Sequence, residues 1–124
     1  MSLNKNIQSV TIINRFGRSV EELKRDGFLL KIPETSTEML LMQCVLQISM
    51  GRDFDEQYGP ISYHVSERGN MTMMTFPMNE HIVLVITKKN LSPISLARKI
   101  SDFLTNQRTQ LVSCNPKKIE IDTS

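Results

Sequence analysis

The sequence predicts an α/β fold of the α+β type, in which a single antiparallel sheet of about five strands carries helices on its faces. Short β-branched or alternating segments recur along the chain, and the last three follow one another at the close spacing of an antiparallel meander. Two helices are expected between and after these segments, one almost wholly apolar and one amphipathic. The 124 residues suit one domain, with a core over residues 9–106 and a tail over residues 107–124.

The first strand is expected over residues 9–14, where β-branched residues cluster, and Gly17 supplies a turn after it. Residues 18–33 are the least regular part of the chain, because their apolar residues fit a strand, a short helix, or both. We predict a strand over residues 28–32, a continuous apolar segment that follows a turn at Asp26-Gly27.

A helix is expected over residues 36–50. Thr35 and Glu38 have the spacing of a capping box, and Gly51 can end the helix in a left-handed conformation. Apolar residues surround the helix axis and leave only a narrow polar strip, formed by Gln43 and Gln47. Such a helix must be covered on more than one side.

Three strands follow an acidic loop over residues 52–57. Residues 61–66 alternate between apolar and polar side chains, as in a half-exposed strand. A second strand is expected over residues 71–76. Residues 81–87 contain five consecutive aliphatic side chains, which is typical of a strand buried on both faces. We therefore predict that residues 81–87 form the centre of the sheet.

The last helix is expected over residues 92–106. Ser92 is a suitable N-cap, and Pro93 occupies the first helical position, where its missing N–H costs nothing. One half of this helix is apolar and the other half polar, so it should lie on the sheet with one face in water.

Composition excludes several classes of function. The net charge is +2 and the basic residues are scattered, which argues against nucleic-acid binding. No apolar run approaches the roughly 20 residues of a membrane span, and residues 1–6 are polar, unlike the core of a signal peptide. Cys44 and Cys114 are far apart in sequence, which favours a reducing, cytoplasmic setting over a disulfide framework.

The residues offer little chemistry for an enzyme. His64 and His81 could form an acid/base or metal pair, but no ligand spacing accompanies them, and ordinary sheet histidines are the better interpretation. Cys44 lies in an apolar helix, where a thiol stays protonated. The five glycines are isolated, so no phosphate-binding loop is present. We expect neither catalysis nor a cofactor.

Several segments together resemble the roadblock/dynein light chain family. The similar segments are residues 9–17 (SVTIINRFG), 81–87 (HIVLVIT) and 90–100 (NLSPISLARKI), together with the long helix that ends before Tyr58-Gly59. The resemblance implies a profilin-like sheet, a homodimer or heterodimer, and a role as a scaffold or regulator of small GTPases and motors. It implies no catalytic centre.

The leading hypothesis is therefore a dimeric, non-enzymatic interaction module that binds a small GTPase or another protein. The apolar helix and the half-polar strand should be buried together when two copies meet around a twofold axis. The residues predicted for the dimer or partner interface are Met39, Met42, Leu46, Met50, Ile61, Tyr63 and Val65.

Two alternatives remain at this point. The helix could instead be covered within one chain by Val20, Leu23, Leu111 or Val112. The protein could also be a small-ligand sensor with a profilin-like or PAS-like sheet, in which a methionine-rich interior encloses a pocket. An enzyme that uses His64 or His81 with a cation is the weakest of the hypotheses.

Overall fold

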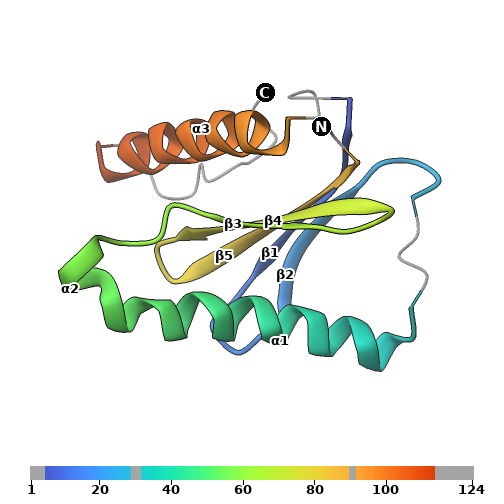
Figure 1. Ribbon diagram of the computed structural model, residues 1–124, viewed down its shortest axis with the longest axis horizontal. Helices are drawn as coiled ribbons and strands as arrows, with labels where there is room; N and C mark the ends of the chain where they lie inside the picture. The colour runs from blue at the N-terminus through green and yellow to red at the C-terminus, as the bar shows by residue number, and fades with distance from the viewer. Residues whose placement is uncertain (1–4, 29–31, 90–91, 114–124) are drawn as a thin grey trace.

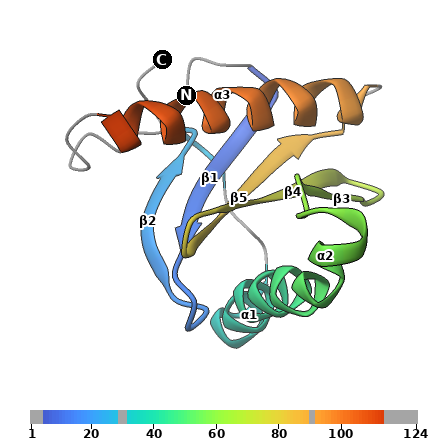
Figure 2. The ribbon, with the colours of Figure 1, turned by 90° about the vertical axis from the view of Figure 1, so that its left-hand side faces the viewer.

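The structure is a computed structural model that describes residues 5–28, 32–89 and 92–113, with side chains up to residue 106. Within these residues one antiparallel five-stranded sheet has the order β2-β1-β5-β4-β3. The sheet lies between α3 on one face and α1 on the other (Figures 1 and 2). The elements are β1 (Ile7–Ile13), β2 (Ser19–Lys24), α1 (Glu34–Gly51), the 3-10 turn η1 (Arg52–Phe54), α2 (Asp55–Tyr58), β3 (His64–Glu67), β4 (Met71–Met78), β5 (His81–Lys88) and α3 (Pro93–Ser113). The predicted fold class is confirmed.

The β1–β2 hairpin is closed by Asn14 and Gly17. The Asn14 side-chain oxygen accepts hydrogen bonds from the backbone N–H groups of Phe16, at 2.9 Å, and Arg18, at 3.0 Å. Gly17 has a φ of 79°, which favours glycine. The turn predicted at Gly17 is therefore confirmed.

The second strand is not where the sequence predicts it. Phe28 follows a turn and Ile32 lies in a bend, while residues 29–31 lie outside the described residues. The strand that pairs with β1 is β2, from Ser9 opposite Lys24 to Ile13 opposite Ser19. All but one of the β2 residues are exposed, so this edge strand has no buried face and shows no apolar alternation.

The helix α1 begins at Glu34, two residues before the predicted start. The capping box is wrong, because Thr35 lies inside the helix and the N-cap residue, Pro33, makes no side-chain cap bond. The Pro33 carbonyl accepts the Thr37 N–H at 3.0 Å, so the hydrogen-bond ladder starts two residues earlier than a cap at Thr35 would set it.

The left-handed end predicted at Gly51 is also wrong. Gly51 has a φ of −66°, and η1 and α2 continue the helical path, so the loop predicted over residues 52–57 is helical. A Cβ at Gly51 would meet the terminal methyl group of Ile61, so that side chain would have to move. Gly59, with a φ of 86°, lies where α2 ends.

The strand predicted over residues 61–66 is shifted to His64–Glu67. It pairs with β4 from His64 opposite Thr75 to Glu67 opposite Thr72. In the same register Ser62 would face Pro77, which has no N–H to donate, so the ladder stops short of it. The strand β4 runs to Met78, and Asn79, with a φ of 58°, turns the chain into β5.

The central position of β5 is confirmed, since it pairs with β1 on one side and β4 on the other. Its residues alternate between two apolar clusters, one on each face of the sheet. The cluster beneath α3 contains Ile7, Val10, Met74, Phe76, Met78, Val83, Val85, Leu96, Ala97, Ile100 and Leu104. The cluster beneath α1 contains Ile13, Leu41, Cys44, Val45, Ile48, Ile82, Leu84 and Ile86.

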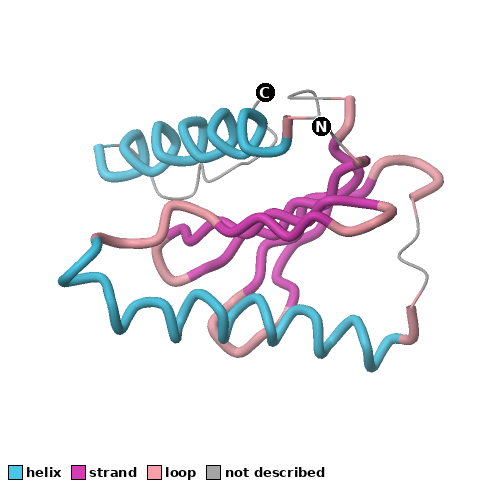
Figure 3. The backbone as a smooth tube through the Cα atoms, viewed as in Figure 1, coloured by secondary structure: helices cyan, strands magenta, loops and turns pink. Residues whose placement is uncertain are grey.

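The helix α3 is longer than predicted. Its backbone is helical to Ser113 (Figure 3), so residues 107–113 are not a loose tail, and residues 114–124 lie outside the described part of the chain. The added residues include Gln, Arg and Leu, which are good helix formers even without an apolar face. Among the described residues, no helix is both long and apolar enough to cross a bilayer.

Candidate interaction surface

The helix α1 has two opposite apolar faces, and only one of them is buried. Leu41, Cys44, Val45 and Ile48 pack against the sheet. At about 100° per residue, the second face lies on the far side of the helix, and we call it the outer face. It consists of Met39, Met42, Leu46 and Met50, which are 63%, 40%, 49% and 67% exposed.

The described residues leave most of the outer face exposed. Val20 is itself 55% exposed. Leu23 pairs with Val10, which belongs to the cluster under α3, so Leu23 lies on the other side of the sheet. The side chains of Leu111 and Val112 lie outside the description. The structure therefore gives no support to the hypothesis that Val20 or Leu23 covers the outer face of α1.

The strand β3 is the edge of the sheet next to α2 (Figure 2). Of the predicted interface residues, only Val65 lies in β3, while Ile61 and Tyr63 precede it. Tyr63 and Val65 pack against the cluster under α3, whereas Ile61 packs against the cluster under α1. The structure therefore unites the four predicted helix residues but divides the three predicted strand residues between two faces.

A groove of about 350 Å³ runs between α1 and the β3 edge, and we call it the edge groove. Its lining is Leu40, Gln43, Cys44, Leu46, Gln47, His64, Val65, Ser66, Arg68, Met73, Thr75 and Leu84. Two polar atoms in it, His64 Nε2 and Thr75 Oγ1, are buried without a hydrogen-bond partner. Sequence reasoning missed this pair, because their proximity follows from the β3–β4 register and not from spacing along the chain.

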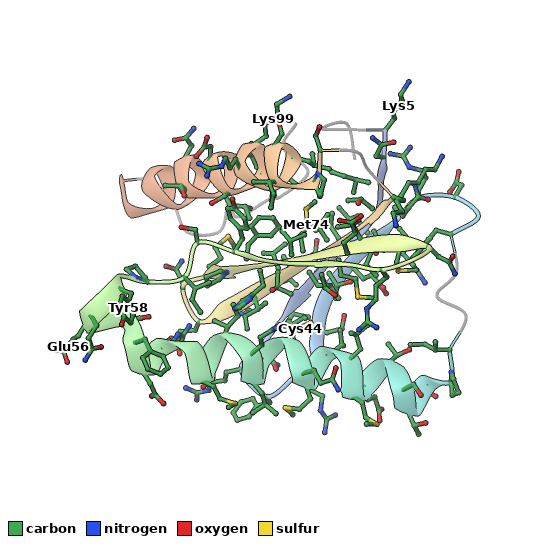
Figure 4. All side chains as sticks on the ribbon, in the orientation of Figure 1. Lys5, Cys44, Glu56, Tyr58, Met74 and Lys99 are labelled. Carbon is green, nitrogen blue, oxygen red and sulfur yellow. The ribbon has the colours of Figure 1, made fainter. Side chains whose placement is uncertain are left out.

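Cys44 forms part of the inner wall of the edge groove and points from α1 toward the sheet (Figure 4). Burial raises the pKa of its thiol from 9.0 to about 11, and a backbone hydrogen bond opposes this only in part. The thiol is therefore protonated at neutral pH, as predicted for a packing residue.

The two histidines do not form a pair. His64 lies opposite Thr75 on the edge strand, whereas His81 lies opposite Met78 at the start of the central strand. Among the described residues, no group of three or more His, Cys, Asp or Glu side chains is arranged to hold a metal ion.

A second groove, of about 330 Å³, lies where α1, α2 and α3 approach the end of β4. Arg52 and Asp55 line it, and Asp55 Oδ1 is buried there without a hydrogen-bond partner. Of the methionines in the sheet, Met73 lines the edge groove. Met74 and Met78 fill the core under α3 (Figure 4 labels Met74) and line neither groove.

No protein-family model and no curated protein matches the sequence. The structure, in contrast, is similar to solved structures. The roadblock/LC7 domain from Streptomyces avermitilis is 12% identical, with a TM-score of 0.60 over 86% of this chain and 87% of that one. Gliding protein MglB from Thermus thermophilus is 13% identical, with a TM-score of 0.58 over 79% and 74%. Myxococcus xanthus MglB is 11% identical, with a TM-score of 0.59 over 88% and 86%.

These likenesses show that the chain has an α+β fold of the roadblock/LC7 type. The chain has a roadblock-like fold, and the resemblance found on residues 9–17 and 81–87 is confirmed at that level.

Proposed function

We propose that the protein is a non-enzymatic interaction module that forms a homodimer and binds a protein partner. The outer face of α1 carries this proposal. Four large apolar side chains in one stripe, uncovered by the described chain, form a patch that soluble monomers rarely leave in water. A dimer about a twofold axis buries part of such a patch on both copies at once.

The arrangement of the dimer follows from the position of β3. Two β3 edges that pair about a twofold axis extend the sheet and bring the two α1 helices side by side. On the helix wheel, Gln43 and Gln47 lie on the β3 flank, and Met50, Met39 and Leu46 follow in that order around the helix. This flank meets the second helix. Met42 lies on the opposite flank, beside Gly17, and stays available for another protein.

A small GTPase is the partner that the family resemblance implies. The outer faces of two adjacent helices would offer it one continuous apolar platform, to which Met39 and Met42 contribute from each copy. We place the protein in the cytoplasm, because a free, buried Cys44 suits a reducing setting.

Solution mass tests the dimer. Sedimentation at micromolar concentration should report twice the chain mass of 14.2 kDa. Leu46→Glu should give a folded monomer, since Leu46 is 49% exposed within one chain. Ile94→Glu is the matched control, because Ile94 has the same exposure but lies on α3, across the sheet. A monomeric unmodified protein would contradict the proposal.

Partner binding needs a separate test. Purified small GTPases of the source cell, loaded with GDP or with a non-hydrolysable GTP analogue, should bind the dimer. Met42→Glu should abolish this binding while the sedimentation of the dimer stays the same. If no GTPase binds in either nucleotide state, the proposed partner is wrong, and only the proposed homodimer remains.

A further inference from the structure

We propose that the protein binds a free amino acid with a medium-sized apolar side chain, such as leucine, in a groove between α1 and the β1–β2 hairpin. This groove measures about 250 Å³, and we call it the hairpin groove. The inference goes beyond the proposed homodimer and does not depend on it, because β2 and β3 are opposite edges of the sheet (Figure 2).

Two hydroxyl side chains form the floor of the hairpin groove. Ser9 and Thr11 line it and are 2% and 5% exposed. They share a face of β1 with Ile13, which packs in the cluster under α1, and Thr11 lies opposite Leu84 of the same cluster. Two polar residues therefore stand where the packing of this face favours aliphatic ones.

The chain itself leaves these hydroxyls without partners. Among the described residues, no side-chain hydrogen bond involves Ser9 or Thr11. The Thr75 hydroxyl is also unpartnered but is enclosed by the chain, whereas Ser9 and Thr11 open into a groove. A buried hydroxyl without a partner is costly. A ligand that enters the hairpin groove can supply the missing hydrogen bonds.

One charged residue lies across from each hydroxyl. In the β1–β2 ladder Lys24 is opposite Ser9, and Glu22 is opposite Thr11. Directly opposed residues share a face, and both charged side chains line the groove while remaining exposed, so they form its rim. Within the described part of the chain, the ion pairs involve neither of them. The groove thus offers a cation and an anion about 7 Å apart along the strand, each above a hydroxyl.

This pattern matches the main-chain groups of an amino acid. The ligand carboxylate can accept hydrogen bonds from the Ser9 hydroxyl and the Lys24 ammonium group. The ligand ammonium group can donate to the Thr11 hydroxyl and the Glu22 carboxylate. A ligand with only one sign of charge would leave one of the two rim residues unmatched.

The remaining walls of the groove fit an apolar side chain. They are formed by Phe28, Leu40, Leu41, Leu84 and Ile86. Pockets for drug-sized ligands measure roughly 300–1,000 Å³, so the hairpin groove suits a smaller molecule. A leucine side chain would cover these walls. Alanine would leave much of their surface in water, and lysine would bring a charge against them.

Isothermal titration of the unmodified protein tests the class of ligand. Leucine should bind, and alanine should bind at least about tenfold more weakly, because its side chain buries fewer carbon atoms. N-acetyl-leucine lacks the ammonium charge and leucinamide lacks the carboxylate, so each should also bind about tenfold more weakly. If leucine does not bind at millimolar concentration, or if both derivatives bind as well as leucine, the inference is wrong.

Variants of β2 test the location of the site. Glu22→Gln should weaken leucine binding about fivefold, since it removes an exposed ionic contact. Glu21→Gln is the matched control, because Glu21 lies opposite Ile12 on the other face of the sheet, and it should leave the dissociation constant unchanged. Equal effects of the two variants would show that leucine binds elsewhere.

The floor of the groove has its own test. Thr11→Val replaces the hydroxyl with a methyl group, so it should weaken leucine binding about fivefold. The resistance of the free protein to urea should stay the same or increase, because an unsatisfied hydroxyl is removed. Weaker binding without a loss of stability separates a ligand contact from a structural role. Unchanged leucine affinity in Thr11→Val would contradict the proposed floor contact.

Discussion

Gly17 of the β1–β2 turn lies directly against Met42 of α1. A Cβ on Gly17 would lie 2.8 Å from Met42 Cε and 3.4 Å from Met42 Cα. The hairpin therefore approaches the backbone of the helix and not merely the end of a flexible side chain. This contact explains why Met42 is the least exposed of the four outer-face residues.

Gly17→Ala should destabilise the protein by about 2 kcal/mol, because it combines a positive φ with a steric clash. Gly27→Ala is the matched control, since Gly27 has a similar φ of 83° but no heavy atom within 4 Å of the added Cβ. It should cost only about 1 kcal/mol, from backbone strain alone. Urea denaturation measures both. Equal losses would show that the contact with Met42 does not matter.

Gly51→Ala should destabilise the protein although alanine is the better helix former, because the new Cβ would overlap Ile61 Cδ1. Adding Ile61→Val removes that methyl group and should recover part of the loss. Ser49→Ala, at an exposed position of the same helix, should instead be neutral or slightly stabilising. Thermal unfolding of the three variants and the unmodified protein checks this, and a stabilising Gly51→Ala would contradict it.

Cys44 should make stability depend on pH above 9. Because the folded state holds the pKa of this thiol at about 11 against 9.0 when unfolded, the unfolded chain loses its proton first. The stability that this shift contributes is complete below pH 9 and is lost between pH 9 and 11. Cys44→Ala should lack this component of the pH dependence. The same thiol should resist labelling by a thiol reagent at pH 8 until the chain is unfolded.

Truncation to alanine should destabilise the protein much more at Phe76 than at Phe16. Phe76 is 1% exposed in the core under α3, so Phe76→Ala should cost about 3–5 kcal/mol. Phe16 is 64% exposed, with the Arg15 guanidinium 5.1 Å from its ring centre. Phe16→Ala should therefore cost less than about 1 kcal/mol. Comparable losses, measured by chemical denaturation, would mean that Phe76 is not in a closely packed core.

The parts of the fold that were predictable are those with a strong local pattern. The five aliphatic residues 82–86 predict a central strand, and Ser92-Pro93 predicts the start of α3. The edge strand β2 has no such pattern, because water covers most of its side chains. The start of β3 depends on Pro77 of the neighbouring strand, which the local sequence of residues 61–66 does not show.

The residues of the candidate site also differ in how well the sequence predicts them. The outer face of α1 repeats at helical spacing, so Met39, Met42, Leu46 and Met50 could be found from the sequence. His64 and Thr75 are 11 positions apart, and they meet only through the strand register. The residues of a site that spans two strands can be recognised only when the pairing register of the strands is known.

The central position of β5 has a consequence for biosynthesis. Among the described residues β5 is the last strand, yet it joins the N-terminal hairpin β1–β2 to the pair β3–β4. While the ribosome is still making residues 81–88, β1 has no inner neighbour and the apolar face of α1 has no completed sheet to pack on. Pairing across such a long sequence separation is slow to form and open to aggregation meanwhile. A nascent chain that stops before His81 should therefore depend on chaperones, and one that reaches Lys88 can close its sheet in a single step.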